Sequence, residues 1–470
     1  MASIKKNFLY NALYNILTLI LPLITAPYIS RIMGAEKIGI YSYSYSIASY
    51  FGLFILLGLN NYGNRSIASV GKEDKKELSK TFWSIYTMQL LMSFIILSVY
   101  IIYTVFIASN KIMAWIQIIY LISVCLDINW FFFGIEQFKL TVTRNTVIKV
   151  LNVIFILLFV KTANDLYLYG LIMSCGTLIS QILLWVFLKR YIAYIKFKKE
   201  DIIKHIKPNI ILFIPVIAVS LYTIMDRIML GMMSNMLEVG YYESANKLTI
   251  IPTLAVTSLG TVMLPRISNM ISKGQEGETV IYLQKSLMIS IVLSTSMAFG
   301  LAAISKEFVP FFYGDGFEKC VYLIPLLVLT SIFISWANVI RTQYLIPYQK
   351  DRIYIVSVLL GAAANMFVNM LLIPYFQSLG AAIGTVFAEF TVCVYQTYMV
   401  RNEIKIGQYL KQSFPLFLSG IIMYIIVVNI PFYINNILTL IIKIICGGII
   451  YLVCCVLCYL LYIRKLFFNQ

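Results

Sequence analysis

Charged side chains occur within stretches of this sequence that are otherwise long and apolar, and their chemistry needs an explanation. Lys149, Lys247 and Glu389 each lie inside such a stretch, and Glu243 precedes Lys247 by one helical turn. A charge in hydrocarbon costs at least about 2.5–3.5 kcal/mol on insertion scales, so it is expected to face a partner or a polar cavity. These residues predict a site for a polar ligand or an ion inside a bundle of membrane helices.

The composition identifies a membrane protein. Of the 470 residues, 60% are hydrophobic and 12% are charged, whereas soluble domains carry about 25% charged residues. The mean hydropathy is +0.86. We predict an all-α membrane protein of about fourteen transmembrane helices, each able to cross roughly 30 Å of hydrocarbon. The expected spans are 8–32, 38–60, 81–107, 112–135, 143–162, 166–188, 208–231, 239–264, 281–305, 320–340, 353–374, 379–400, 412–430 and 436–463.

The distribution of basic residues predicts which side each loop faces. Cytoplasmic loops usually carry the excess of Lys and Arg, and most of the 37 such residues fall on one side if both termini are cytoplasmic. The net charge of +17 either marks this topology or serves an anionic partner. We favour topology and contact with membrane lipids, and expect no nucleic acid partner, because no RNA- or DNA-binding motif accompanies the charge.

The chain contains an internal repeat. Arg31-Ile32-Met33-Gly34 with Gly39-Ile40-Tyr41-Ser42 returns as Arg227-Ile228-Met229-Leu230-Gly231 with Gly240-Tyr241-Tyr242-Glu243-Ser244. A doubled membrane chain predicts a transporter of two pseudo-symmetric six-helix lobes around a central cavity. The expected parts are 1–188 (amino-terminal lobe), 189–207 (basic cytoplasmic linker), 208–405 (second lobe) and 406–470 (two further helices).

Motifs for catalysis and metal binding are missing from the sequence. We find no P-loop and no Ser, His and Asp set, so neither an ATP motor nor a hydrolase is expected. The single histidine, His205, lies in the basic linker, where a solvated loop position is expected. The eight cysteines are expected to be packing thiols. We predict no enzyme, no metal and no cofactor, with transport driven by protons, sodium or the membrane potential.

Several motifs resemble those of the bacterial polysaccharide repeat-unit flippases. They are APYISRIMG at 26–34, GIYS at 39–42, DR at 226–227 with GYY at 240–242, and WFFFGIEQ at 130–137. These Wzx-type proteins belong to the multidrug/oligosaccharidyl-lipid/polysaccharide exporter superfamily, which also holds multidrug exporters and lipid II flippases. The resemblance covers nearly the whole chain. It implies flipping of undecaprenyl-diphosphate-linked oligosaccharides to the outer leaflet of the bacterial plasma membrane, for capsule, exopolysaccharide or O-antigen assembly, with a polymerase and chain-length machinery as partners.

Such a substrate needs a polar, cationic cavity, and the polar residues within spans are the candidates for its lining. Lys247 either serves the cavity or forms a self-neutralising pair with Glu243. The tyrosines of 41–46 either stack on sugars or pack between helices, and Asp127 either lines the cavity or neutralises Lys149. The full set of cavity candidates is Lys149, Asn152, Asp127, Asn365, Lys247, Glu243, Tyr41 and Tyr45.

Two further roles are predicted from position. Arg31, Asp226 and Arg227 lie at matching helix ends and form a candidate outer gate, with Arg31 pairing with Asp226 or Glu238, although interfacial snorkelling also explains the arginines. Glu389 is a candidate proton or sodium site with Asn365 and Asn369 as possible neighbours. Arg341 is expected in a loop, and Glu307 in an outer connection that spans about 306–319.

Three alternatives remain open. A multidrug exporter of the same fold often uses an acid in its first helix, and no acid occurs between Lys6 and Arg31. A lipid II flippase tends to carry basic residues midway along that helix, and here the stretch is uncharged. A membrane polysaccharide polymerase or ligase usually presents a large outer loop, and the longest outer connection expected here is short.

Overall fold

The structure, a computed structural model of the chain, confirms the predicted fold class. It describes residues 4–71, 73–431, 436–458 and 460, and within them it contains helices and no strand. Thirteen of the helical segments in this part of the chain are long and apolar enough to cross a membrane. The first covers two of the predicted spans, so the count agrees with about fourteen. The chain is therefore a multi-pass membrane protein.

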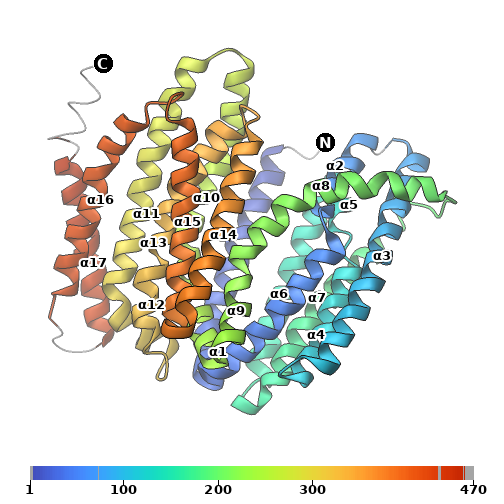
Figure 1. Cartoon of the computed structure of the whole chain (residues 1–470), viewed down its shortest axis with the longest axis horizontal. Helices are drawn as coiled ribbons and strands as arrows, with labels where there is room; N and C mark the ends of the chain where they lie inside the picture. The colour runs from blue at the N-terminus through green and yellow to red at the C-terminus, as the bar shows by residue number, and fades with distance from the viewer. Residues whose placement is uncertain (1–3, 72, 432–435, 459, 461–470) are drawn as a thin grey trace. The chain divides into compact units, whose positions relative to one another are not determined.

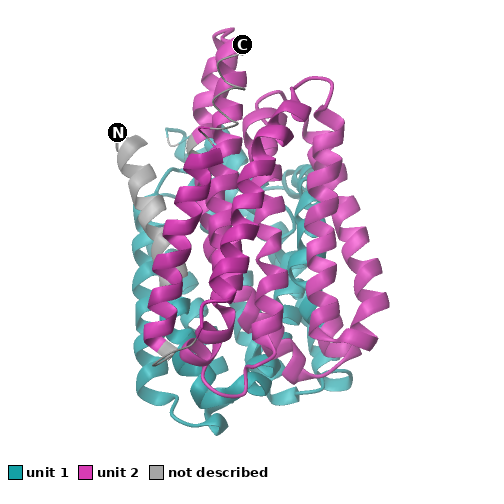
Figure 2. Ribbon diagram, turned by 90° about the vertical axis from the view of Figure 1, so that its left-hand side faces the viewer, with its two compact units in different colours: residues 1–228 teal, residues 229–470 magenta. Residues whose placement is uncertain are grey.

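The chain divides into two units, residues 1–228 and 229–470, coloured in Figure 2. Unit 1 contains α1 (Ile4–Leu56), α2 (Leu59–Val70), α3 (Lys75–Phe106), α4 (Lys111–Cys125), α5 (Asn129–Gly134), α6 (Phe138–Phe159), η1 (Ala163–Asp165), α7 (Leu166–Leu188) and α8 (Lys199–Thr223). The short α9 (Met225–Met233) crosses the boundary. Unit 2 contains α10 (Met236–Ser272), α11 (Glu276–Tyr313), α12 (Cys320–Leu327), α13 (Leu329–Ile340), η2 (Arg341–Leu345), α14 (Asp351–Phe376), α15 (Ser378–Val400), α16 (Ile406–Val428) and α17 (Asn436–Cys458), as Figure 1 labels them.

A glycine separates the first two predicted spans. Gly34 has φ 70° and ψ 173°, which divides α1 into two helices at a kink. A positive φ is strained for residues with a side chain and is readily adopted by glycine. The sequence therefore breaks the helix where the hydropathy pattern predicts a connection.

The core of unit 1 is aromatic. Trp130, Phe131 and Phe132 of the WFFFG motif are fully buried, and Phe82 of α3 packs against Trp130 and Phe131 with ring centroids 5.5 and 5.1 Å apart. Gly63 of α2 faces the Trp130 ring so closely that an added Cβ would lie 2.7 Å from it. The motif therefore packs α2, α3 and α5 together.

In unit 2, α11 lies against α10, α13, α16 and α17. The Gln284 Nε2 of α11 donates to Gln412 Oε1 of α16 at 2.8 Å. Thr295 of α11 hydrogen-bonds Tyr451 of α17 at 2.7 Å. The two last helices are thus joined to α11 by buried polar contacts as well as by apolar packing.

Several helices extend beyond the apolar stretches that predicted them. α8 begins at Lys199, inside the predicted linker, and packs against α2 and α3 of unit 1. α11 continues to Tyr313, so the position predicted for Glu307 in an outer loop is wrong. The loop position predicted for Arg341 is also wrong, because the chain continues from α13 into the π-helix η2. Hydropathy marks the hydrocarbon layer, whereas the helix itself can continue into the polar layer. The lobe boundaries inferred from the repeat stay a prediction.

Candidate functional site

A buried chain of hydrogen bonds links α5, α6 and α7 of unit 1. The Asp127 Oδ1 accepts from Asn129 Nδ2 at 2.7 Å, and the Asn129 Oδ1 accepts from Arg144 Nη2 at 3.0 Å. Arg144 also donates to Asn145 Oδ1 at 2.6 Å, which accepts from Ser180 Oγ at 3.1 Å. Arg144 does not lie in a cytoplasmic loop. It is buried in the second turn of α6.

Lys149 and Asn152 continue this polar stripe along α6. They follow Asn145 by four and seven residues, which places all three on one helix face. Lys149 and Asn152 are both half-buried. The Asn152 amide fills the space beside Gly176 of α7, where an added Cβ would lie 2.3 Å from Asn152 Oδ1. The stripe thus presents a cation and amides at the middle of a membrane helix, whereas Asp127 lies in the Arg144 network at its end.

The tyrosines of α1 contact rings of neighbouring helices in unit 1. Tyr41 and Tyr45 stack with ring centroids 5.9 Å apart, and Tyr41 also meets Tyr169 of α7 edge to face at 4.8 Å. Tyr45 meets Tyr120 of α4 at 5.0 Å and remains 38% exposed. Helix packing explains these contacts, while the exposed part of Tyr45 can still meet a sugar.

The candidate gate residues lie beside the Gly34 kink of α1 and at the start of α9. Arg31 is exposed one turn before Gly34, whereas Asp226 is buried, and Arg227 donates to the Thr223 carbonyl at 2.8 Å. Arg31 and Asp226 both belong to unit 1, so a contact between these two would lie within one unit. The gate therefore stays a prediction.

In unit 2, Glu243 and Lys247 form the ion pair that their spacing suggests. The Lys247 Nζ lies 3.6 Å from Glu243 Oε1, and the two side chains are 33% and 15% exposed. At this distance and exposure the pair is loose enough for a competing anion to approach the ammonium. The ammonium can bind a phosphate oxygen by a charge-assisted hydrogen bond.

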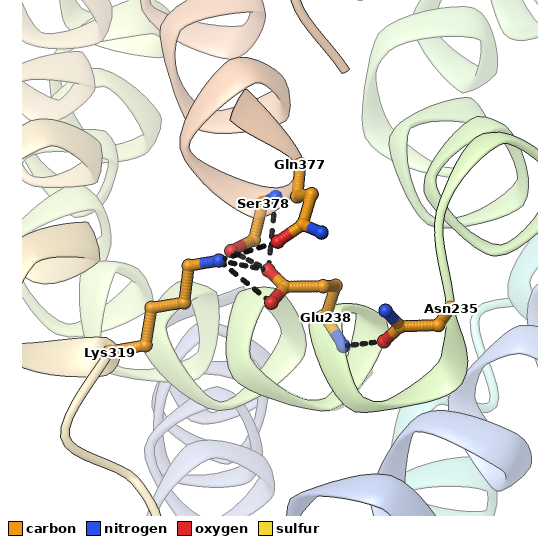
Figure 3. Close-up of polar contacts among 5 residues, drawn as sticks. All are labelled: Asn235, Glu238, Lys319, Gln377 and Ser378. Atoms are coloured by element: carbon orange, nitrogen blue, oxygen red, sulfur yellow. Dashed lines mark hydrogen bonds and ion pairs between the residues drawn. The ribbon is translucent and has the colours of Figure 1, made fainter. Parts of the chain in front are cut away.

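A second acidic residue of α10, Glu238, is the centre of a buried cluster shown in Figure 3. Its two carboxylate oxygens accept from Lys319 Nζ at 2.7 and 2.8 Å, and it also accepts from the Ser378 hydroxyl and, at 3.2 Å, the Ser378 N–H. Lys319 donates to Gln377 Oε1 at 3.0 Å, and Asn235 caps α10 through the Glu238 N–H. Sequence reasoning considered Glu238 as a partner of Arg31 and missed this cluster within unit 2.

Buried amides lie along the contact between α14 and α15. Asn369 donates to Asn365 Oδ1 at 3.2 Å, and an added Cβ at Gly384 would lie 2.0 Å from Asn369 Oδ1. Glu389 follows Gly384 by five residues, which turns it about 140° around α15. Glu389 is half-buried. The two asparagines of α14 therefore lie against the Gly384 face of α15, and Glu389 lies on a different face of that helix.

A buried ion pair joins α11 to α17. The Lys443 Nζ lies 2.7 Å from Glu307 Oε1, with side chains 4% and 8% exposed, and Glu307 Oε2 has no hydrogen-bond partner among the described residues. The loop position predicted for Glu307 did not anticipate this pair. The signal that was missed is that an intramembrane lysine requires a carboxylate nearby.

His205 is buried in unit 1, so the solvated loop position predicted for it is wrong. Its Nδ1 lies 2.6 Å from the Tyr62 hydroxyl, and its Nε2 lies 3.0 Å from Ser84 Oγ. Since Ser84 donates to the Thr81 carbonyl at 3.0 Å, its oxygen accepts from His205 Nε2–H, and Tyr62 donates to Nδ1. The histidine therefore joins α8 to α2 and α3 as a neutral ring.

The sequence profile of one protein family, described as polysaccharide biosynthesis protein, matches residues 4–271. This match covers more than half of the chain. The chain belongs to the polysaccharide biosynthesis protein family.

Curated relatives of this polysaccharide biosynthesis protein span most of its length. A protein of Escherichia coli strain K12 named for O-antigen transport is 22% identical over 406 residues, covering 85% of this chain and 97% of the relative. One of Shigella dysenteriae with the same name is 23% identical over 401 residues, covering 84% and 100%. The names are those of transporters, in keeping with the expectation that this chain is not an enzyme.

Solved structures show the fold to which this family member is similar. A lipid II flippase MurJ structure superposes with a TM-score of 0.78 at 17% identity, covering 95% of this chain and 99% of that one. An inward-facing multidrug transporter of the MATE family superposes with a TM-score of 0.60 at 11% identity, covering 84% and 99%. The chain therefore has a fold similar to those of the MurJ and MATE structures.

Proposed function

We propose that this protein flips undecaprenyl-diphosphate-linked oligosaccharide repeat units from the inner to the outer leaflet of the bacterial plasma membrane by alternating access. The observation that carries this proposal is the presence, in each unit, of a half-buried lysine within a membrane helix: Lys149 on α6 and Lys247 on α10. A diphosphate needs cations along its route through hydrocarbon, because an uncompensated charge there is costly. Similarity to O-antigen transporters over most of the chain supports the choice of substrate.

The two lysines have different surroundings, which suggests different steps. Lys149 belongs to a stripe of amides that can hydrogen-bond sugar hydroxyls as well as phosphate. Lys247 is paired with Glu243 at 3.6 Å, so a phosphate that binds the ammonium displaces the carboxylate. In this proposal Lys149 receives the head group and Lys247 exchanges its internal carboxylate for the substrate's anion.

The test is transport by the purified full chain in vesicles. A fluorescent undecaprenyl-diphosphate oligosaccharide is supplied in one leaflet, and its arrival in the other is followed with a membrane-impermeant quencher. Lys149→Ala and Lys247→Ala should each slow transport about ten-fold to a hundred-fold, since a hydrogen bond to a charged group contributes about 1.5–3 kcal/mol. Lys273→Ala, which removes an exposed lysine at the end of α10, should transport at the wild-type rate. Wild-type rates in both cavity variants would refute the roles of these lysines.

Glu389 is the proposed site of ion coupling, with a proton or a sodium ion as the coupling ion. A half-buried carboxylate within a membrane helix can change its charge state during a transport cycle. Glu389→Gln should remove any dependence of transport on an imposed pH or sodium gradient. If the gradient still accelerates the variant as much as wild type, the membrane potential or another residue drives the step.

A lipid II flippase is the second candidate, because the MurJ fold superposes over nearly the whole chain. The same vesicle assay separates the two when lipid II replaces the oligosaccharide substrate. We expect the repeat-unit substrate to be moved and lipid II to be left in place. A polysaccharide polymerase and chain-length proteins are the proposed downstream partners, and their genes should neighbour this reading frame.

A further inference from the structure

Residues 189–207, which comprise the connection from α7 to α8 and the start of α8, concentrate positive charge on the surface of unit 1. It contains two acids and seven basic residues, all seven of them exposed. In the described part of the chain, only one of these cations has a carboxylate within 4.0 Å: Lys204, which lies 3.8 Å from Asp201. The basic residues are Lys189, Arg190, Lys196, Lys198, Lys199, Lys204 and Lys207.

The backbone of this segment is held in place by unit 1. Trp83 Nε1 donates to the Ala193 carbonyl at 3.0 Å, and the Ala193 N–H donates to Ser79 Oγ at 3.0 Å. Further along, Asp201 pairs with Lys80 of α3 at 2.9 Å. The hydrogen bonds of His205 to α2 and α3 fix the other end. The cations between these anchors are therefore presented from a fixed backbone, which reduces the entropy lost on binding.

Aromatic and apolar side chains accompany the charges. Tyr194 is 76% exposed and packs edge to face on Trp83 with centroids 5.8 Å apart, and Ile203 is 62% exposed. Trp185 of α7 lies beside Trp83 at 6.4 Å. Trp and Tyr collect at the level of the lipid headgroups, and a basic segment with exposed apolar residues is typical of a surface that lies in the interface. The segment also follows one candidate span, α7, and leads into the next.

The corresponding segment of unit 2 differs. After α15 the chain carries Arg401 and Lys405, with Glu403 between them, and Glu403 pairs with Lys350. Arg401 lies over the Tyr398 ring at 3.6 Å. Of these two segments, the one in unit 1 therefore carries more cations, and six of its seven have no carboxylate within 4.0 Å in the described part of the chain.

We propose that Lys196, Lys198 and Lys199, with Tyr194 and Trp83 beside them, form a binding surface for the headgroups of anionic phospholipids. The cations bind the headgroup phosphate. The Tyr194 and Trp83 rings and Ile203 lie against the upper part of the acyl chains. A soluble anionic partner would bind through the charges alone, and the exposed apolar side chains would have no role in its binding. This surface is separate from the substrate site proposed above and does not depend on it.

The experiment is a titration of the purified full chain in detergent with phosphatidylglycerol, in which bound lipids are counted by native mass spectrometry. Phosphatidylcholine, which has no net charge, is the parallel arm. Wild type should bind phosphatidylglycerol preferentially. The triple variant Lys196→Gln, Lys198→Gln, Lys199→Gln should bind it on the order of a hundredfold more weakly, since each lysine contributes about a five-fold factor near an anionic surface.

A matched control removes three exposed lysines of unit 2, by Lys285→Gln, Lys405→Gln and Lys411→Gln. It loses the same charge and should retain the preference for phosphatidylglycerol. Both triple variants should melt at the wild-type temperature, because none of the changed side chains forms an ion pair within the described part of the chain. Equal weakening in the two triples, or equal binding of the two lipids by wild type, would overturn the proposal. Tyr194→Ala should weaken phosphatidylglycerol binding less than the lysine triple does. An unchanged affinity in this variant would show that the Tyr194 ring is not part of the binding surface.

Discussion

The two units carry related sequences, but they solve the same structural problem with different polar groups. Asn110 precedes α4 in unit 1 and donates to the Tyr167 hydroxyl at 3.4 Å. In unit 2, Lys319 directly precedes α12 and donates to Gln377, with Glu238 as its carboxylate partner. The contact at the start of α4 is thus a neutral hydrogen bond, whereas the lysine at the start of α12 has several partners, one of them charged.

The second difference concerns a glycine that both copies contain. In unit 1, α1 ends at Leu56, Leu57 has φ 52°, and Gly58 begins the turn into α2. In unit 2, α10 continues through Gly260 to Ser272. Gly58 lies against the backbone of α8, while Gly260 lies against the side chains of Asn338 and Thr342. Gly58 and Gly260 thus both permit a close approach of a neighbouring helix. Only Gly58 accompanies a break in the helix that precedes it.

The largest expected effect comes from the buried pair of Glu307 and Lys443, which joins α11 to α17 in unit 2. Glu307→Ala or Lys443→Ala leaves one buried charge unpaired and should cost about 3–5 kcal/mol. The melting temperature of the purified full chain in detergent measures the loss. The double variant Glu307→Leu, Lys443→Met removes both charges and should recover most of it. Two single variants as stable as wild type would show that the pair is hydrated and contributes little.

Removing one partner of the cluster in Figure 3 comes next and compares the units directly. Glu238→Ala leaves Lys319 without its carboxylate and should cost about 1.5–3 kcal/mol, the usual range for a hydrogen bond to a charged group. Asn110→Ala removes the side-chain cap that accepts from the Met113 N–H at 3.0 Å and should cost about 1 kcal/mol. The melting temperatures of the two variants, measured in the same way, rank the two losses of stability. A larger loss in Asn110→Ala would contradict the idea that charge makes the unit 2 contact more demanding.

The paired glycines give a smaller contrast. An added Cβ at Gly58 would lie 2.5 Å from the Asn209 carbonyl, which is backbone, whereas at Gly260 it would lie 2.5 Å from the Asn338 side-chain amide. A side chain can move more easily than a backbone, so Gly58→Ala should cost about 1–3 kcal/mol and Gly260→Ala less. Gly274→Ala does not serve as a control, because its φ is positive. Gly277→Ala, where nothing lies within 4 Å, should leave the melting temperature unchanged.

These contrasts show what the sequence could and could not predict. Hydropathy predicted the helices, because it depends on residues near one another in the chain. The partners of Glu238, Glu307 and His205 could not be predicted, because each lies on a helix far away in sequence. Composition also gave a wrong prediction at Glu307, because an acidic residue beside an apolar stretch is typical of a loop. Here the helix continues past it. Individual contacts depend on which helices are neighbours, which a single sequence does not reveal.

The smallest expected effect is the pH dependence that Glu403 of unit 2 contributes. Hydrogen bonds from Lys350 and then Tyr344 lower the pKa of Glu403 below its ordinary value of 4.5. Its stabilising contribution is therefore complete above that value and is lost as the pH falls through the depressed pKa. Because the Glu403 side chain is 39% exposed, screening limits the effect to a few tenths of a kcal/mol. Residues 189–193, which follow α7 at the corresponding place in unit 1, contain no acid. The melting temperature of wild type should thus fall slightly more than that of Glu403→Gln between about pH 7 and about pH 3. Parallel curves for the two proteins would assign the acid sensitivity to other carboxylates.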